Sequence, residues 1–543
     1  FFQISGACGN HALGDTRLDK MPDARCMHYR KTEATLMALP RFARNTLNST
    51  LAGASTALGA FLSVVVVARL LGPDGAGSVA LAIWLIGTLV TICDLGLPMT
   101  VARFLPDLNA RAQKDEATRF APAFFLPLLA TTALGVAICV FVSLFRPQVE
   151  AVLPITPFDN LPNHVWLGLA FLFAMQAIGN YGLGELRGRQ RFDEAARLSS
   201  VSFAIQIVGV GLGAWFFGVT GAIIGYGGGS LLLAAHALRN IGYGGVVDPE
   251  LRARAWRFSL ASWGVGLIAA IVWSRTELAF LSHFRSPREA GLYAVANTLA
   301  QVATQAPLLM TGGLLAHFAE RHAIGDQEGL KRAFESAVRF MALVTFPACF
   351  GMAALAPSLV PALFGWNFAE ASGPAAVLVA AQAFGAVSAV SSALLFAAER
   401  NYVLVWTGAL GAIAVLVSGF TIIPQYGLDG AVYARSAIQF AIVAASFIYI
   451  GQRLDCPTPY ASVVRIMLAA AGCGFAAREI VITFPGWLGI ALGVFTGALV
   501  YLALVRLLRA LPQEDVGRVL DVVGKMPSWI SPVLSPLVQF FER

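Results

Sequence analysis

The sequence is short of charge. Asp, Glu, Lys and Arg together make up 13% of its 543 residues, whereas hydrophobic residues make up 57%. A soluble protein of this length needs more charged side chains to cover its surface. The mean hydropathy of +0.70 points the same way. The composition therefore excludes an ordinary soluble globular protein and indicates a membrane protein.

Cysteine is also sparse, and its spacing is uninformative. A disulfide framework or a zinc site would need closely spaced cysteines such as a CxxC pair. The sequence has no such pair among its seven cysteines, which are Cys8, Cys26, Cys93, Cys139, Cys349, Cys456 and Cys473. Scattered thiols of this kind are typical of small apolar positions in spans and loops. We expect neither a disulfide framework nor a metal site.

Recognisable catalytic motifs are missing as well. His317 and His322 are five residues apart, so they do not match the spacing of the HExxH motif. The glycine-rich stretch GVGLG at 209–213 lies inside an apolar run without a preceding strand, which favours close helix packing over dinucleotide binding. We therefore expect no enzyme activity and no cofactor.

What the sequence has in abundance is long apolar runs. A helix needs about 20 apolar residues to cross a bilayer, and this criterion predicts fourteen spans. They lie at roughly 45–70, 75–98, 119–146, 162–185, 196–217, 219–239, 257–282, 289–313, 335–359, 373–397, 401–423, 428–450, 461–482 and 485–508. The predicted fold class is an all-α polytopic membrane protein.

Part of the chain is duplicated. The copies are ARLLGPDGAGSVALA at 68–82 and SHFRSPREAGLYAVA at 282–296, followed by GVTGA at 218–222 and GLDGA at 427–431. Pro73 aligns with Pro287 and Gly77 with Gly291, at an offset of 214 residues. Each half of the duplicated part contains six predicted spans. An even number of spans returns the chain to the side of the membrane on which it started. We therefore predict two parallel six-helix lobes followed by two C-terminal helices.

The predicted domains follow from this repeat. They are an N-terminal lobe at 41–250, a C-terminal lobe at 251–452, two additional transmembrane helices at 453–510 and a cytoplasmic tail at 511–543. The tail is expected either to form a short amphipathic helix on the membrane or to fray. Residues 1–36 are polar and aperiodic, and Met37 is a candidate start, so we expect a disordered or non-native extension at 1–40.

Basic residues fix the predicted orientation. With the N-terminus placed inside, 23 Lys and Arg residues fall in the inside loops and five in the outside loops. Cytoplasmic loops of membrane proteins carry such an excess of positive charge. We therefore predict that both termini are cytoplasmic. The net charge of +7 reflects membrane topology, and we expect no nucleic-acid partner.

Amide side chains recur inside the apolar spans. Asn297, Gln301 and Gln305 are spaced by four residues, and Gln439 shares a helix face with Arg435. An amide that faced lipid would lack hydrogen-bond partners. These side chains therefore face either neighbouring helices or a wet cavity, and they are candidates for substrate binding.

Charged residues inside or at the ends of the spans are the remaining candidates. A charge costs about 3 kcal/mol or more at the bilayer centre unless it is accommodated. Arg275 and Glu277 are two residues apart and point about 200° away from each other on a helix, so we expect one to face a cavity and the other a neighbouring helix. Arg275 and Arg435 are candidate substrate contacts or members of buried ion pairs. Asp94 and Arg103 either snorkel to the interface or form a cytoplasmic gate.

The repeat motif resembles a known family. ARLLGPDGAGSVALAIWLIGTLVTICDLGLPMTVARFL at 68–105 and RTELAFLSHFRSPREAGLYAVA at 275–296 are similar to polysaccharide flippases of the O-antigen (Wzx) type. These belong to the multidrug/oligosaccharidyl-lipid/polysaccharide exporter superfamily, and the resemblance covers about residues 41–510. Lipid II flippases of that superfamily carry a charged pair in the first span, where this chain has the uncharged stretch SVVVVAR.

The resemblance implies a function. It implies a bacterial inner-membrane transporter that carries an undecaprenyl-pyrophosphate-linked oligosaccharide outward by alternating access, with Arg275 as a cavity cation. The implied partners are that lipid-linked oligosaccharide and membrane lipid, with a polysaccharide polymerase and glycosyltransferases as open candidates. Two alternatives stay open: a multidrug exporter of the same superfamily, and a membrane glycosyltransferase, polymerase or ligase that acts on lipid-linked sugars.

Overall fold

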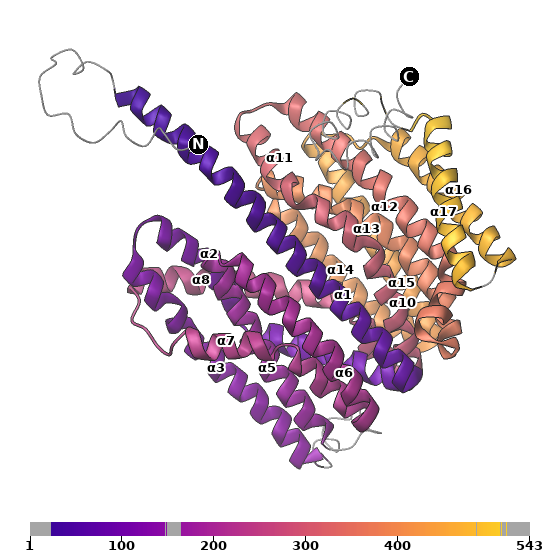
Figure 1. The fold of residues 1–543 in the computed structure, drawn as a ribbon, viewed down its shortest axis with the longest axis horizontal. Coiled ribbons are helices and arrows are strands. Elements are labelled where there is room, and N and C mark those ends of the chain that lie inside the picture. Colours follow the sequence, from indigo (N-terminus) through magenta and orange to yellow (C-terminus); the bar gives the residue numbers. More distant parts are fainter. Residues whose placement is uncertain are drawn as a thin grey trace, which may run out of the picture.

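The computed structural model describes residues 23–146, 148, 164–484, 486–510, 512 and 517. The described part of the chain is helical (Figure 1). Its first elements are α1 (Asp23–Cys93), α2 (Leu97–Ala110), α3 (Lys114–Leu144), α5 (Val165–Gly188), α6 (Phe192–Gly228), α7 (Leu231–Asn240), α8 (Pro249–Trp273) and α9 (Glu277–Phe284). They are followed by α10 (Pro287–Leu309), η1 (Met310–Gly313), α11 (Leu314–Ala323), α12 (Gln327–Phe364), η2 (Trp366–Ala371), α13 (Ser372–Ala397), α14 (Asn401–Thr421), α15 (Ile423–Arg453), α16 (Tyr460–Thr483) and α17 (Trp487–Leu507).

The predicted spans map onto these helices, so the all-α polytopic fold is confirmed. Among the described residues, 11 helices are long and apolar enough to cross a membrane. Two of them hold more than one predicted span, because a glycine with positive φ redirects the chain inside the helix. Gly72 (φ 67°) divides α1, and Gly218 (φ 59°) divides α6. Helices α8 and α9 together form the seventh span.

Helix α10 contains the eighth predicted span but is not among those 11 helices. Its interior amides lower its apolar character, and the structure shows why the fold tolerates them. Every residue from 291 to 300 is buried, so this stretch is enclosed by protein rather than by lipid. A central helix of this kind can carry polar side chains that a lipid-facing helix cannot.

The two halves repeat each other in conformation as well as in sequence. Gly218 (φ 59°, ψ −137°) and Gly427 (φ 55°, ψ −133°) occupy the same place in the GVTGA and GLDGA motifs and have nearly the same backbone angles. Short helices α2 and α11 each follow the second span of their half. Helix α2 packs on α3, α5 and α8, and α11 packs on α12 and α13. In Figure 1 they lie on opposite sides of the first segment of α1.

The two copies of the repeat motif touch each other at their glycines. A Cβ atom on Gly77 would lie 1.9 Å from the Pro287 carbonyl oxygen, and one on Gly291 would lie 2.0 Å from the Pro73 oxygen. This contact is reciprocal, as expected around a twofold axis that relates the copies. Nearby, Arg69 donates to the Leu363 carbonyl at 2.8 Å and ties α1 to the end of α12. We call the set Pro73, Gly77, Pro287 and Gly291 the glycine contact.

Some predictions concern residues that are not described. Residues 1–22, most of the loop at 147–163 and the tail at 511–543 apart from Pro512 and Gly517 lie outside the described residues. Helix α1 begins at Asp23, within the predicted N-terminal extension. The extension, the tail and the domain boundaries therefore stay predictions.

Replacing Gly77 by alanine should destabilise the protein, because the new methyl group would lie 1.9 Å from a backbone oxygen. Overpacking of this kind costs about 1–3 kcal/mol. Gly264 is the control, since a methyl group there would meet nothing within 4 Å. Thermal unfolding of the purified protein in detergent measures both variants. An unchanged midpoint for Gly77→Ala would contradict the glycine contact.

Candidate functional site

A cavity of about 700 Å³ lies between the two copies of the repeat. Its walls come mainly from both segments of α1, from α8 and from α10, with Gln176 of α5 and Tyr226 of α6 completing them. Most of the lining is apolar. The charged and amide groups that line it are Arg275, Gln176, Gln301 and Gln305.

The repeat organises the lining. Five lining residues of α1 give a lining residue of α10 when the offset of 214 is added. The pairs are Ala80 and Ala294, Trp84 and Thr298, Gly87 and Gln301, Thr88 and Val302, and Thr91 and Gln305. The same helix face of each copy therefore faces the cavity, and the two copies differ in the chemistry they present.

Trp84, Thr88 and Thr91 are lining residues that the sequence analysis missed. Their spacing of four and three residues places them on one helix face. The Trp84 Nε1 and Thr88 Oγ1 atoms are buried without a hydrogen-bond partner among the described residues. The amide stripe at 297, 301 and 305, shifted back by 214, points to positions 83, 87 and 91, so the repeat could have identified this face.

Arg275 lies in the break between α8 and α9. Its φ of 64° is left-handed, a conformation that costs a residue other than glycine about 1–2 kcal/mol. Its Nη2 atom donates to Gln301 Oε1 of α10 at 2.7 Å, within the cavity wall. The strained backbone thus places a guanidinium beside the amide stripe.

The amide stripe divides between two environments. Gln301 and Gln305 line the cavity, whereas Asn297 is 8% exposed and does not line it. Each step of four residues rotates the side chain by about 40°, so the three amides span about 80° of the helix surface. This drift takes Asn297 into the protein interior, where its Nδ2 atom has no hydrogen-bond partner among the described residues.

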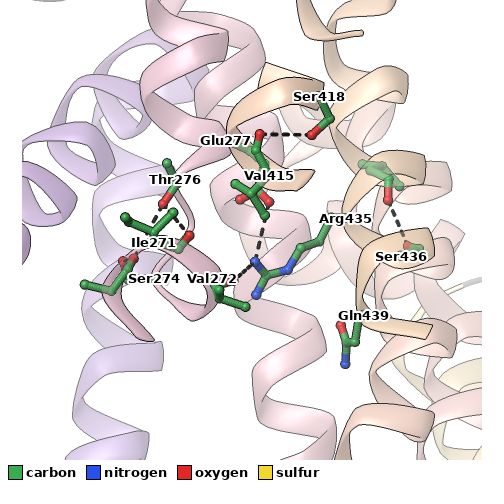
Figure 2. A network of polar contacts seen from close by, with 12 residues as sticks. Ile271, Val272, Ser274, Thr276, Glu277, Val415, Ser418, Arg435, Ser436 and Gln439 are labelled. Atoms are coloured by element: carbon green, nitrogen blue, oxygen red, sulfur yellow. Dashed lines mark hydrogen bonds and ion pairs between the residues drawn. The ribbon is translucent and has the colours of Figure 1, made fainter. Parts of the chain in front are cut away.

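Glu277 and Arg435 lie together, away from the cavity lining. Their side chains form an ion pair with an Nη1 to Oε1 distance of 3.4 Å, and only 2% of Glu277 and 9% of Arg435 is exposed. Figure 2 shows Arg435 reaching from α15 toward Glu277 and also toward Val272, whose carbonyl oxygen accepts a hydrogen bond from Arg435 Nη1. Gln439 donates to Gln382 at 3.0 Å. These three predicted binding residues therefore do not belong to the described lining of the cavity, whereas Arg275 does.

Asp94 and Arg103 lie at the α2 end of the bundle. Asp94 accepts a hydrogen bond from the Gly96 backbone N–H at 2.8 Å and so orders the turn between α1 and α2. The guanidinium of Arg103 lies 4.9 Å from the centre of the Phe258 ring on α8, within cation–π range. Both residues stabilise the junction of α2 with its neighbours, and the gate stays a prediction.

Comparison with known proteins identifies the family. Residues 66–373 match the family described as polysaccharide biosynthesis protein, which is more than half of the chain. The chain is also 23% identical over 324 residues to the succinoglycan biosynthesis transport protein ExoT of Rhizobium meliloti (strain 1021). That alignment covers 57% of this chain and 60% of the relative, so the match spans less than two thirds of that protein.

Two solved structures share the fold. The lipid II flippase MurJ in an inward closed conformation matches with a TM-score of 0.66 at 14% identity, over 86% of this chain and 98% of that one. An inward-facing multidrug resistance transporter of the MATE family, of the MOP superfamily, matches with a TM-score of 0.60 at 14% identity, over 74% and 94%. At this identity the likeness concerns the fold alone.

Removing the Thr88 hydroxyl should not destabilise the protein. Because this hydroxyl has no hydrogen-bond partner among the described residues, Thr88→Val should leave the free energy of unfolding unchanged or raise it slightly. Ser259→Ala is the control, since the Ser259 hydroxyl donates to the Leu95 carbonyl at 2.7 Å and its loss should cost about 0.5–1.5 kcal/mol. Thermal unfolding in detergent compares the two variants. A loss at Thr88 as large as that at Ser259 would show that its hydroxyl is bonded in the folded protein.

Proposed function

We propose that this chain, which belongs to the polysaccharide biosynthesis protein family, carries a polyprenyl-pyrophosphate-linked oligosaccharide across the bacterial inner membrane. Translocation proceeds from the cytoplasmic to the outer leaflet by alternating access, in the service of surface polysaccharide synthesis. The observation that carries the proposal is the cavity between the repeat copies, which combines one guanidinium with several amides. The similarity to ExoT, which is named as a succinoglycan biosynthesis transport protein, also supports the proposal.

The charge of the cavity favours an anionic cargo. Arg275 is the charged residue of the described lining, which contains no Asp or Glu. A guanidinium can donate two parallel hydrogen bonds to a phosphate oxygen pair, and it does so most strongly where water is partly excluded. An exporter of cationic drugs would favour a carboxylate in this position. The multidrug alternative is therefore the weaker one for this chain.

The rest of the lining suits a sugar. Gln176, Gln301 and Gln305 supply amide donors and acceptors, and Thr88 supplies a hydroxyl. Trp84 offers an aromatic surface, and its indole N–H has no hydrogen-bond partner in the part of the chain that the structure describes. Apolar walls with a few placed polar groups are the usual character of a small-molecule site. The described lining has no carboxylate that could serve as a general base, which favours transport over the glycosyltransferase alternative.

The arrangement of the two ends supports alternating access. The copies meet backbone to backbone at the glycine contact, so that end of the cavity is closed. Helices α2 and α11 lie toward the other end, where α2 packs on α8 of the second half as well as on α3 and α5, and α11 packs on α12 and α13. The excess of basic residues assigns the α2 and α11 end to the cytoplasm. On this proposal the cargo enters from that end of the cavity.

Arg275→Ala should reduce polysaccharide export by about tenfold or more in cells that depend on this protein, because a partly buried phosphate would lose its cation. Arg275→Lys should retain part of the export, since an amine keeps the charge but not the fork. Arg288→Ala is the control, since Arg288 is exposed and pairs with Glu370 outside the cavity. Surface polysaccharide is measured at matched protein levels. Full export by Arg275→Ala would overturn the cavity-cation role.

A further inference from the structure

The break between α8 and α9 is a structural problem inside a membrane span. A helix end leaves its last carbonyl oxygens without intrahelical partners, and lipid offers no donors to replace them. Helix α8 ends at Trp273 and α9 begins at Glu277, so the carbonyls just before Trp273 need donors from elsewhere. How these carbonyls are satisfied determines how the break is held.

Two of the donors are local. The Ser274 hydroxyl donates to the Ala270 carbonyl, and the Thr276 hydroxyl donates to the Ile271 carbonyl at 2.7 Å. Figure 2 shows both side chains turned back toward the end of α8. Because each of them belongs to the break itself, they shape it without connecting it to the rest of the lobe.

The third donor comes from far along the chain. The Val272 carbonyl accepts from Arg435, which is 163 residues away on α15. The same Nη1 atom lies 3.4 Å from Glu277 Oε1, and Glu277 is the first residue of α9. One buried guanidinium therefore contacts the last turn of α8 and the first turn of α9 at once. We call this set, Val272, Glu277 and Arg435, the bracket.

The bracket constrains the residue between its two anchors. With Val272 and Glu277 both held on the α15 side, the chain between them passes through the left-handed conformation of Arg275. The Arg275 side chain donates to Gln301 in the cavity wall. Arg435 lines no part of the cavity, yet it contacts both segments that aim Arg275.

We propose that Arg435 is a positioning residue, which through Val272 and Glu277 holds the break so that position 275 faces the cavity. The inference rests on the proposed function for its biological meaning. Its physical content, the orientation of position 275, can be measured without any transport. The contact with Glu277 pairs the charge of Arg435, and the contact with Val272 gives that carbonyl its donor. Both contacts therefore belong to the role.

Thiol labelling tests this orientation. Arg275→Cys is introduced into protein whose seven native cysteines are replaced, and its reaction rate with a water-soluble methanethiosulfonate is measured in detergent. Adding Glu277→Met and Arg435→Met together removes the bracket without leaving an unpaired buried charge. We expect the labelling rate at position 275 to fall about tenfold, because conformers in which this side chain turns away from the cavity become populated. Adding Arg435→Lys alone should keep the rate within about threefold, because an ammonium retains several donors.

Gln305→Cys is the matched control, since Gln305 lines the cavity from α10 and is independent of the break. Its rate should not change in the bracket variants. If the double methionine variant does not accumulate, the exchanged pair Glu277→Arg with Arg435→Glu replaces it. That variant keeps an ion pair but removes the donor at position 435, and it should slow labelling in the same way.

Three results would overturn the proposal. One is an unchanged rate at position 275 when the bracket is removed. Another is an equal fall at positions 275 and 305, which would show general loss of the cavity. The third is a parental rate in the exchanged pair, which would show that the ion pair alone suffices. None of these depends on whether Arg275→Ala still exports polysaccharide, so this inference and the proposed function fail separately.

Discussion

The structure depends on one close approach, in which two helices touch through their backbones. Gly77 and Gly291 meet the carbonyl oxygens of Pro287 and Pro73, at positions where a Cβ atom would lie within about 2 Å of oxygen. A contact this tight is short-range and reciprocal, and it holds the two repeat copies together at one end. The cavity begins beside this contact, since the helix segments that line it, at 79–91 and 294–305, come just after Gly77 and Gly291 in the sequence.

The lobes share a scaffold and differ in charge. The α1 copy presents Trp84, Thr88 and Thr91, whereas the α10 copy presents Thr298, Gln301 and Gln305, with Arg275 beside it. The cation requires a broken helix, and a broken helix in a membrane requires donors for its exposed carbonyls. Serine, threonine and a buried arginine meet that requirement here. The second lobe therefore carries the charged group of the described cavity lining, and a buried ion pair follows it at the start of α9.

The architecture could be predicted from the sequence more fully than the side-chain contacts could. Span length, loop charge and the repeat are properties of long segments, and the fourteen predicted spans agree with the helices. The spacing of Arg275 and Glu277 predicted that they point apart. Their partners were beyond reach, because Glu277 meets Arg435 across 158 residues. The burial of the Asn297 side chain depends on which helices surround α10. The sequence of α10 alone cannot show that. The Trp84 face was predictable from the repeat offset and was missed.

Alternating access is tested most directly by measuring both ends of the cavity at once. Spin labels at Asp74 and Arg288 report on the end with the glycine contact, and labels at Ala110 and Ala323 report on the ends of α2 and α11. Double electron–electron resonance would be recorded in nanodiscs with and without a polyprenyl-pyrophosphate-linked sugar. We predict that the Asp74–Arg288 distance gains a longer population while the Ala110–Ala323 distance gains a shorter one. Distances that stay unchanged, or that lengthen together at both ends, would contradict alternating access.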